Sequence, residues 1–94
     1  DKWHVSPYYI TSHAIISCLT YDVELCQQSV DWMIQTQRSD GSWGFYAAST
    51  AEETAYCLQA LKIWELAGNK LPKGRLEIGS SWLLDHYQDF QVEF

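Results

Sequence analysis

An internal repeat of two helices constrains the fold of this chain more than any other feature. Residues 14–19 and 55–61 are apolar on most sides, whereas the stretch that follows each of them has a distinct polar face. The triplet Trp-Met-Ile at 32–34 recurs as Trp-Leu-Leu at 82–84, and 82 − 32 = 50 residues separate the two. A period of this length with two helices per unit is typical of stacked helical hairpins. The sequence therefore predicts an all-α fold of antiparallel hairpins, with apolar helices inside and amphipathic helices outside.

Apolar spacing and capping residues set the approximate limits of four helices. They are expected from Thr11 or Ser12 to about Leu19, from about Val23 to Gln37, from Ser49 or Thr50 to Ala67, and from Gly74 or Arg75 to about Tyr87. Residues 1–9 are expected to be extended or irregular, because Pro7 disfavours a helical conformation at Ser6. Thr50-x-x-Glu53 is a capping box, with Ser49-x-x-Glu52 as an alternative one residue earlier. Capping explains both carboxylates without a pair of catalytic acids.

Stacked hairpins place their inner helices parallel, so the N-termini of these helices lie at one end of the structure. That end should gather the residues that lead into the first inner helix, Trp3, Tyr8, Tyr9 and His13, and those that lead into the second, Ser49, Thr50, Glu52 and Glu53. Helix N-termini there favour anions. The stack either opens into a solenoid or closes into an α/α barrel. Because two hairpins bury little surface, we expect more repeats outside residues 1–94.

Charge and cysteine content narrow the classes of partner. Twelve acidic and six basic residues give a formal charge of −6, which argues against nucleic acid and anionic membrane surfaces as main partners. No apolar run is long enough to span a bilayer. Cys18, Cys26 and Cys57 form no metal-binding spacing, and we interpret them as reduced thiols on buried helix faces of a cytoplasmic protein.

Residues 37–43 read Q-x-x-x-G-x-W and follow the second helix. Gly41 permits a tight turn there. The Gln37 amide can hydrogen-bond a neighbouring helix end, and Trp43 can stack over it. We interpret this segment as a structural link between outer helices rather than a catalytic site.

Three segments together resemble the terpene cyclase superfamily. Residues 37–43 resemble its QW motif, and residues 49–58 are similar to its S-T-x-x-[EQ]-T-A-[YW]-x-L helix start. Residues 1–9 are similar to the D-K-W-x-x-S-P-Y-Y stretch of class II diterpene cyclases. The three occur in the family order and cover the chain to about Trp64.

The resemblance implies that residues 1–94 are part of the β domain of a class II diterpene cyclase, an (α/α)6 barrel. Such enzymes protonate geranylgeranyl diphosphate and cyclise it to a bicyclic labdane-type diphosphate, usually copalyl diphosphate. Their acid is the middle Asp of a D-x-D-D motif, which this sequence lacks. The γ domain and the rest of the barrel are missing as well, so we expect this chain alone to be inactive. Mg²⁺ is implied by the family only, with no ligand set in these residues.

The resemblance also suggests residues for the substrate cavity. Trp3 and Tyr9 have the six-residue spacing of a cavity-lining Trp and Tyr in squalene–hopene cyclases, and Tyr8 and His13 lie beside them. Aromatic faces stabilise carbocations. Packing at the barrel rim is the alternative for Trp3 and Tyr8. His13 is a candidate base that ends the cascade, or a rim or core histidine.

Two other readings remain open at this point. The β subunit of a protein prenyltransferase is also an α/α barrel with similar turns, but it needs a zinc site from Asp, Cys and His. A non-catalytic helical-repeat module that binds proteins is the third reading, and a charged inner face would support it.

Overall fold

The computed structural model contains four helices in the part of the chain that it describes, which is residues 6–19, 21–44 and 49–86. Their bounds are α1 Pro7–Cys18, α2 Val23–Thr36, α3 Ala51–Leu66 and α4 Arg75–Asp85. These described residues hold no strand, so the predicted all-α class is confirmed. The predicted limits of the second, third and fourth helices agree with α2, α3 and α4 to within one or two residues.

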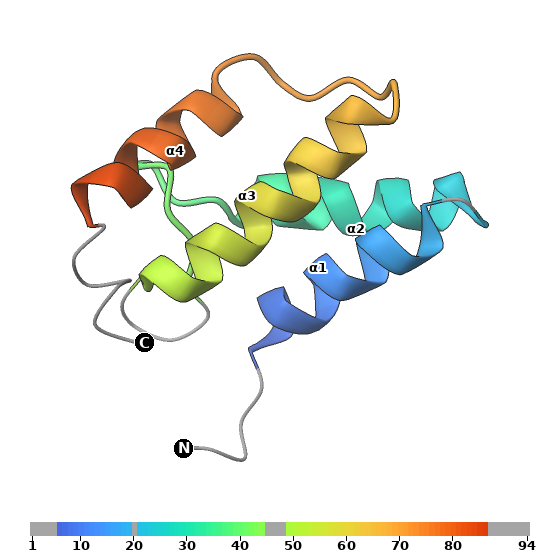
Figure 1. Cartoon of the computed structure of the whole chain (residues 1–94), viewed down its shortest axis with the longest axis horizontal. Helices are drawn as coiled ribbons and strands as arrows, with labels where there is room; N and C mark the ends of the chain where they lie inside the picture. The colour runs from blue at the N-terminus through green and yellow to red at the C-terminus, as the bar shows by residue number, and fades with distance from the viewer. Residues whose placement is uncertain (1–5, 20, 45–48, 87–94) are drawn as a thin grey trace.

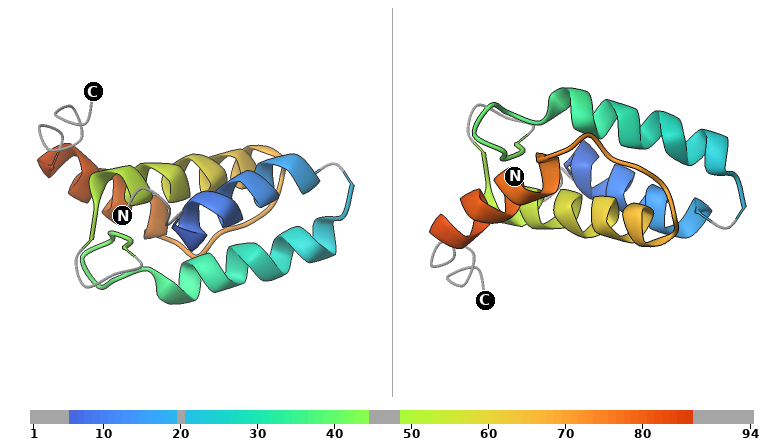
Figure 2. Two further views of the ribbon diagram at one scale, coloured as in Figure 1. Left: turned by 90° about the horizontal axis from the view of Figure 1, so that it is seen from below. Right: turned by 90° about the horizontal axis from the view of Figure 1, so that it is seen from above.

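The four helices form two antiparallel hairpins, α1–α2 and α3–α4 (Figure 1). Helices α1 and α3 lie side by side and run in the same direction, and two further views show α2 and α4 returning in the opposite direction (Figure 2). Helix α1 packs on both α2 and α3, and α3 packs on both α1 and α4. The two helices predicted to be inner ones are therefore the central pair.

The beginning of the first helix corrects the sequence-based limits. Helix α1 begins at Pro7 rather than at Thr11 or Ser12, and Ser6 is its N-cap, with Ser6 Oγ accepting the N–H of Tyr8 at 3.1 Å. Ser6 is indeed non-helical, as Pro7 requires. However, proline is also favoured at the first helical position, where its missing N–H is not needed. Tyr8 and Tyr9 therefore lie in the first turn of a helix and not in an extended segment.

The hydrophobic core lies between the helices that pack on each other, which are α1 with α2, α1 with α3, and α3 with α4. Its largest fully buried side chains are Trp43, Trp64, Ile15, Met33 and Leu61. Cys26 and Cys57 are buried free thiols, whereas Cys18 is half-buried. The Cys26 thiol donates a hydrogen bond to the carbonyl of Ile15 at 3.5 Å, which joins α2 to α1.

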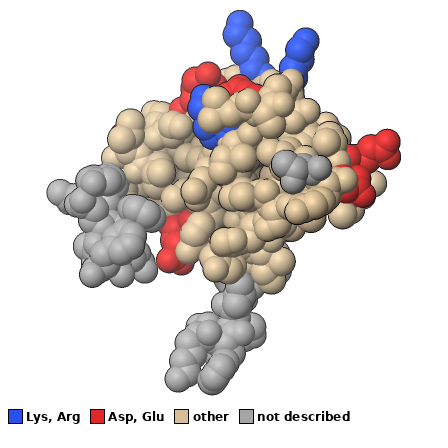
Figure 3. Space-filling model, turned by 45° about the vertical axis from the view of Figure 1, so that its right-hand side comes forward, with Lys and Arg blue, Asp and Glu red and all other residues tan. Residues whose placement is uncertain are grey.

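Large apolar side chains also remain on the surface of the described residues. Ile10 of α1 is 58% exposed, and Ile16 on the same helix is also exposed. In Figure 3, uncharged side chains cover most of the face shown, and charged ones lie toward its edges. No helix among the described residues has the length and apolar character needed to cross a membrane.

Candidate functional site

The N-termini of α1 and α3 meet at one end of the structure, joined by a carboxylate. Ser6 Oγ, at the start of α1, donates a hydrogen bond to Glu53 Oε2 in the first turn of α3, at 2.5 Å. The other carboxylate oxygen, Oε1, accepts a hydrogen bond from the Thr50 hydroxyl at 2.9 Å. This contact confirms that the two inner helices begin at the same end. Glu53 is only 7% exposed.

The cap of α3 is an altered form of the predicted capping box. Thr50 is the N-cap, and its Oγ1 accepts the N–H of Glu53 at 3.0 Å. In a complete capping box the glutamate would accept the N–H of the N-cap residue. Here the N–H of Thr50 is donated to the carbonyl of Trp43 at 3.2 Å. Ser49 does not cap the helix, since its hydroxyl lies 2.6 Å from that of Ser42.

One turn beyond this junction, three ring side chains come together on α1 and α3. The rings of Tyr9 and Tyr56 meet edge to face with centroids 5.0 Å apart, and the rings of Tyr9 and His13 lie 4.4 Å apart. Tyr9 is 38% exposed and His13 is exposed, while Tyr56 is half-buried. We call these three residues the aromatic face. Burial, followed by the nearby Glu52 and Tyr9, raises the pKa of the Tyr56 hydroxyl.

Of the residues predicted for a cavity, the structure brings together Tyr9 and His13. Tyr8 lies elsewhere, because neighbouring helical residues point about 100° apart. Its ring is 4% exposed and stacks on Trp32 of α2, with centroids 5.0 Å apart. Tyr8 thus packs between α1 and α2. Trp3 lies outside the described residues.

Sequence reasoning missed Tyr56 as a site residue, although it occupies the Tyr/Trp position of the helix-start motif at residues 49–58. Its partner Tyr9 lies 47 residues earlier, and no local spacing relates the two. The parallel arrangement of the inner helices was the usable signal. Ser6 and Tyr9 are three residues apart, as are Glu53 and Tyr56, so a junction at the helix starts places the two tyrosines level with each other.

The Q-x-x-x-G-x-W segment links three helices. Gln37 Nε2 donates to the carbonyl of Gly41 at 2.9 Å and to that of Arg75, the first residue of α4, at 3.0 Å. The Arg75 guanidinium donates in return to Gln37 Oε1 at 3.3 Å. The predicted hydrogen bond from Gln37 to a neighbouring helix end is confirmed.

Trp43 fastens the same segment to α2 and α3. Its indole N–H donates to the carbonyl of Met33 at 2.9 Å, and its backbone N–H donates to the Thr54 hydroxyl at 3.0 Å. Ser42 stabilises the turn through hydrogen bonds to Asp40, which lower the pKa of that carboxyl. All of these hydrogen bonds join groups of the protein to one another, as expected for a structural link between helices.

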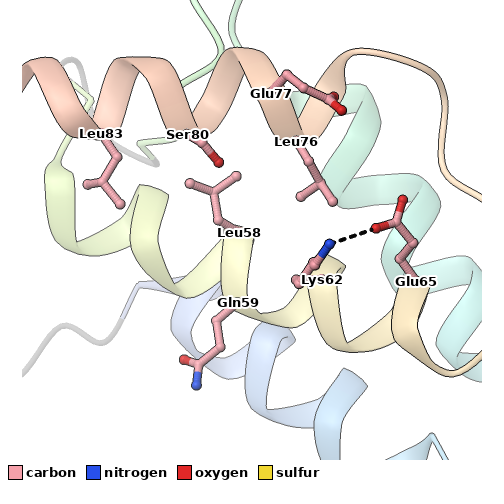
Figure 4. A pocket seen from close by; sticks show the side chains of 8 residues that line it. All are labelled: Leu58, Gln59, Lys62, Glu65, Leu76, Glu77, Ser80 and Leu83. Atoms are coloured by element: carbon pink, nitrogen blue, oxygen red, sulfur yellow. Dashed lines mark hydrogen bonds and ion pairs between the residues drawn. The ribbon is translucent and has the colours of Figure 1, made fainter.

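A groove of about 570 Å³ lies between α3 and α4 (Figure 4). Leu58, Leu76 and Leu83 point into it from the two helices. Lys62 and Glu65 form an ion pair at 3.2 Å along one side. The groove is mainly apolar and lacks a pairing of nucleophile and base among the described residues that line it, so we assign it no chemistry.

The described residues contain no group of three or more His, Cys, Asp or Glu side chains that could hold a metal ion. A zinc site of Asp, Cys and His, as a protein prenyltransferase needs, is therefore not found among these residues.

Comparison with known proteins relates the chain to enzymes of diterpene cyclisation, although no family model matches it. A type B diterpene cyclase of Mycobacterium tuberculosis is 45% identical over 87 residues, which are 92% of this chain and 17% of the relative. A copalyl diphosphate synthase of Streptomyces anulatus is 45% identical over 65 residues, 65% of this chain and 12% of the relative. An ent-copalyl diphosphate synthase of Streptomyces sp. (strain KO-3988) is 36% identical over 93 residues, 95% of this chain and 18% of the relative.

The matched segment is short relative to these proteins, because the chain spans less than a fifth of the length of each. The identity nevertheless extends over most of the chain itself. With 36–45% identity to these enzymes, the chain belongs to the family of diterpene cyclases and copalyl diphosphate synthases.

Proposed function

We propose that the full-length protein is a class II diterpene cyclase acting on geranylgeranyl diphosphate. A proton adds to the terminal double bond, two ring closures follow, and loss of a proton gives a bicyclic labdane-type (copalyl) diphosphate. The substrate and product are isomers, and the diphosphate is retained. The names of the relatives, diterpene cyclase and copalyl diphosphate synthase, support this reaction class. Residues 1–94 contain no D-x-D-D, so the acid lies elsewhere and this chain alone is inactive.

In this proposal the chain supplies part of the cavity wall within an (α/α)6 barrel, which the γ domain and the other repeats complete. The observation that carries this role is the aromatic face on the two parallel inner helices. Each aromatic ring that faces a carbocation stabilises it by roughly 0.5–2 kcal/mol. Among the described residues we assign that contact to Tyr9 and Tyr56, and not to Tyr8, because Tyr8 stacks on Trp32.

His13 is the candidate base for the final deprotonation. It lies one turn after Tyr9 on the same helix and is exposed beside the tyrosine ring. A neutral imidazole accepts a proton near neutral pH. We propose no Mg²⁺ ligand among the described residues.

The test is turnover of geranylgeranyl diphosphate by the purified full-length protein, followed by dephosphorylation and mass spectrometry. We expect a bicyclic diterpene alcohol from the wild type. Tyr9→Leu should lower kcat by about 2- to 30-fold, which corresponds to the cation–π range above. Tyr21→Leu is the matched control, since Tyr21 is 88% exposed and lies outside the helices. Unchanged substrate with the folded wild-type protein would contradict the proposal.

A further inference from the structure

Glu53 connects the two inner helices through more contacts than a helix cap requires. Its carboxylate accepts one hydroxyl from Thr50 on its own helix and one from Ser6 at the start of α1. The Ser6 oxygen simultaneously accepts the N–H of Tyr8. One hydrogen-bonded path therefore runs from the first turn of α1 to the first turn of α3 across a sequence separation of 47 residues.

The carbonyl of Trp43 takes over one hydrogen bond that the glutamate of a capping box usually accepts. The N–H of Thr50, which a capping-box glutamate would accept, is bonded to the carbonyl of Trp43 instead. Oε2 of Glu53 accepts the hydroxyl of Ser6. A carboxylate that accepts two hydroxyl groups also satisfies part of the hydrogen bonding that a buried charge demands.

The aromatic face lies one turn further along both helices. Tyr9 follows Ser6 by three residues and Tyr56 follows Glu53 by three, so each tyrosine lies above its own end of the connection. A shift of α1 along α3 would separate the two rings, because their edge-to-face contact spans only 5.0 Å between centroids. The Ser6–Glu53 hydrogen bond opposes such a shift.

We infer that Glu53 is a positioning residue, which sets the placement of Tyr9 against Tyr56 by holding Ser6. Glu53 takes no direct part in the chemistry of either ring. It acts through the relative position of α1 and α3. The consequence for the reaction rests on the proposed function: a displaced aromatic face leaves the cation less well held, so it loses its proton at other carbons. The product ratio is then the property that Glu53 controls.

The experiment compares four variants of the full-length protein with the wild type. Glu53→Ala removes both acceptors, and Ser6→Ala removes the arm to α1 together with the side-chain cap of that helix. Glu53→Gln retains one oxygen acceptor and adds an amide N–H group that can donate to the hydroxyl oxygen of Ser6 or Thr50. This variant should therefore preserve the connection between α1 and α3. Asp22→Ala is the matched control, because the Asp22 carboxylate caps α2 through the N–H of Leu25 at 3.1 Å, away from the aromatic face.

Two readouts separate positioning from stability. In protein labelled with 3-fluorotyrosine, the ¹⁹F signals of Tyr9 and Tyr56, identified by replacing each with Phe, report the ring contact without substrate. We expect Glu53→Ala and Ser6→Ala to shift both signals, whereas Asp22→Ala and Glu53→Gln leave them close to the wild type. With geranylgeranyl diphosphate, the same two shifting variants should raise the fraction of minor products at least 3-fold, and Asp22→Ala should not.

Either of two results would overturn the inference. One is unchanged ¹⁹F signals in Ser6→Ala and Glu53→Ala, with a fall in Tm like that of Asp22→Ala, which would make Glu53 a helix cap only. The other is shifted signals with an unaltered product ratio. If the folded wild type converts no substrate, the proposed function fails. The ¹⁹F signals then decide whether Glu53 positions the rings.

Discussion

Among single residues, Gly41 lies where two distant parts of the chain come into close contact. Its φ of +94° lies in the left-handed region. A Cβ added there would clash with Ile78 Cγ2 and would lie 2.6 Å from the carbonyl carbon and oxygen of Ile78. The side chain of Ile78 can move, but its backbone is part of α4. Glycine is therefore required at this position both for its conformation and for the approach of α4.

Gly41→Ala should therefore destabilise the protein more than the same change at Gly68. Gly68 has a similar φ of +101°, but nothing lies within 4 Å of its added Cβ. Gly68→Ala should cost about 1–2 kcal/mol for the left-handed backbone. Gly41→Ala should cost a further 1–3 kcal/mol or so for overpacking. Urea unfolding of both variants measures the difference, and equal losses would show that α4 yields freely.

The thiol of Cys57 makes the free energy of unfolding depend on pH in the alkaline range. Burial, and to a smaller extent the Glu53 carboxylate, raises the pKa of this thiol well above its ordinary value. In the unfolded chain the thiol ionises above roughly pH 8.5, while in the folded protein it stays protonated. The folded state then binds more protons than the unfolded state, so the free energy of unfolding falls as pH rises in this range.

We expect the free energy of unfolding to lose up to about 1.4 kcal/mol per pH unit from Cys57 above roughly pH 8.5. Cys57→Ala should make the slope between pH 7 and 9.5 shallower, whatever its effect on stability at pH 7. Cys57→Ser is a second variant without a titrating thiol and should give the same slope as the alanine. Denaturant titrations at several pH values measure it. A slope equal to that of the wild type would contradict the assignment.

At the scale of elements, the end of α2 and the start of α4 depend on one side-chain amide. Gln37 donates to carbonyls of Gly41 and Arg75 and accepts from the Arg75 guanidinium. Both donated hydrogen bonds use the Nε2 group. A carboxylate in its place would present an oxygen to two carbonyl oxygens.

Gln37→Glu should therefore lower the free energy of unfolding by about 1–3 kcal/mol, the range for unsatisfied buried polar groups. Gln35→Glu is the control, because Gln35 is exposed on the same helix and gives the same change of charge. Its effect should stay within about 0.5 kcal/mol. Thermal or urea unfolding distinguishes the two. A similar loss in both variants would indicate a general effect of added negative charge on a chain that already carries −6.

The existence and order of the helices were predictable from the sequence, and the direction of individual side chains was less so. Apolar spacing and the Thr50 cap predicted α2, α3 and α4 closely, since these signals are local. The predicted start of α1 was wrong because a proline such as Pro7 has two opposite effects on helices. It ends a helix that precedes it, but it favours the first position of a helix that follows. That error hid the divergence of Tyr8 and Tyr9, which follows directly once both are helical.

The candidate site depends on contacts that no local pattern contains. The parallel inner helices were predicted from the repeat, and with them the meeting of their N-termini. The pairing of Tyr9 with Tyr56 and of Ser6 with Glu53 additionally requires the register between α1 and α3. Register is set by the packing of whole helix faces, so it was available only from the structure.

For the molecule as a whole, the exposed apolar side chains of α1 determine how residues 1–94 behave in isolation. Ile10 is 58% exposed, and Ile16 and Tyr9 are exposed on the same helix. Apolar surface of this kind favours association. In the proposed barrel, other repeats would cover Ile10, whereas Tyr9 would face the cavity.

Residues 1–94 expressed alone should therefore self-associate, with a weight-average mass well above the 10.9 kDa of the monomer in sedimentation velocity experiments. Ile10→Glu should move that mass toward the monomer by at least half of the excess. Gln28→Glu, at an exposed position of α2, adds the same charge and should leave the mass unchanged. A monomeric wild-type segment would contradict the expectation.

The parallel course of α1 and α3 also has a consequence during synthesis of the protein. Helix α1 can pair with α2 soon after it leaves the ribosome, but its other neighbour begins far later in the chain. Glu53 follows Ser6 by 47 residues. At a synthesis rate of roughly 5–20 residues per second, Glu53 is added about 2–10 seconds after Ser6. Throughout that interval the side of Tyr9 that later meets Tyr56 is open to chaperones and to neighbouring nascent chains.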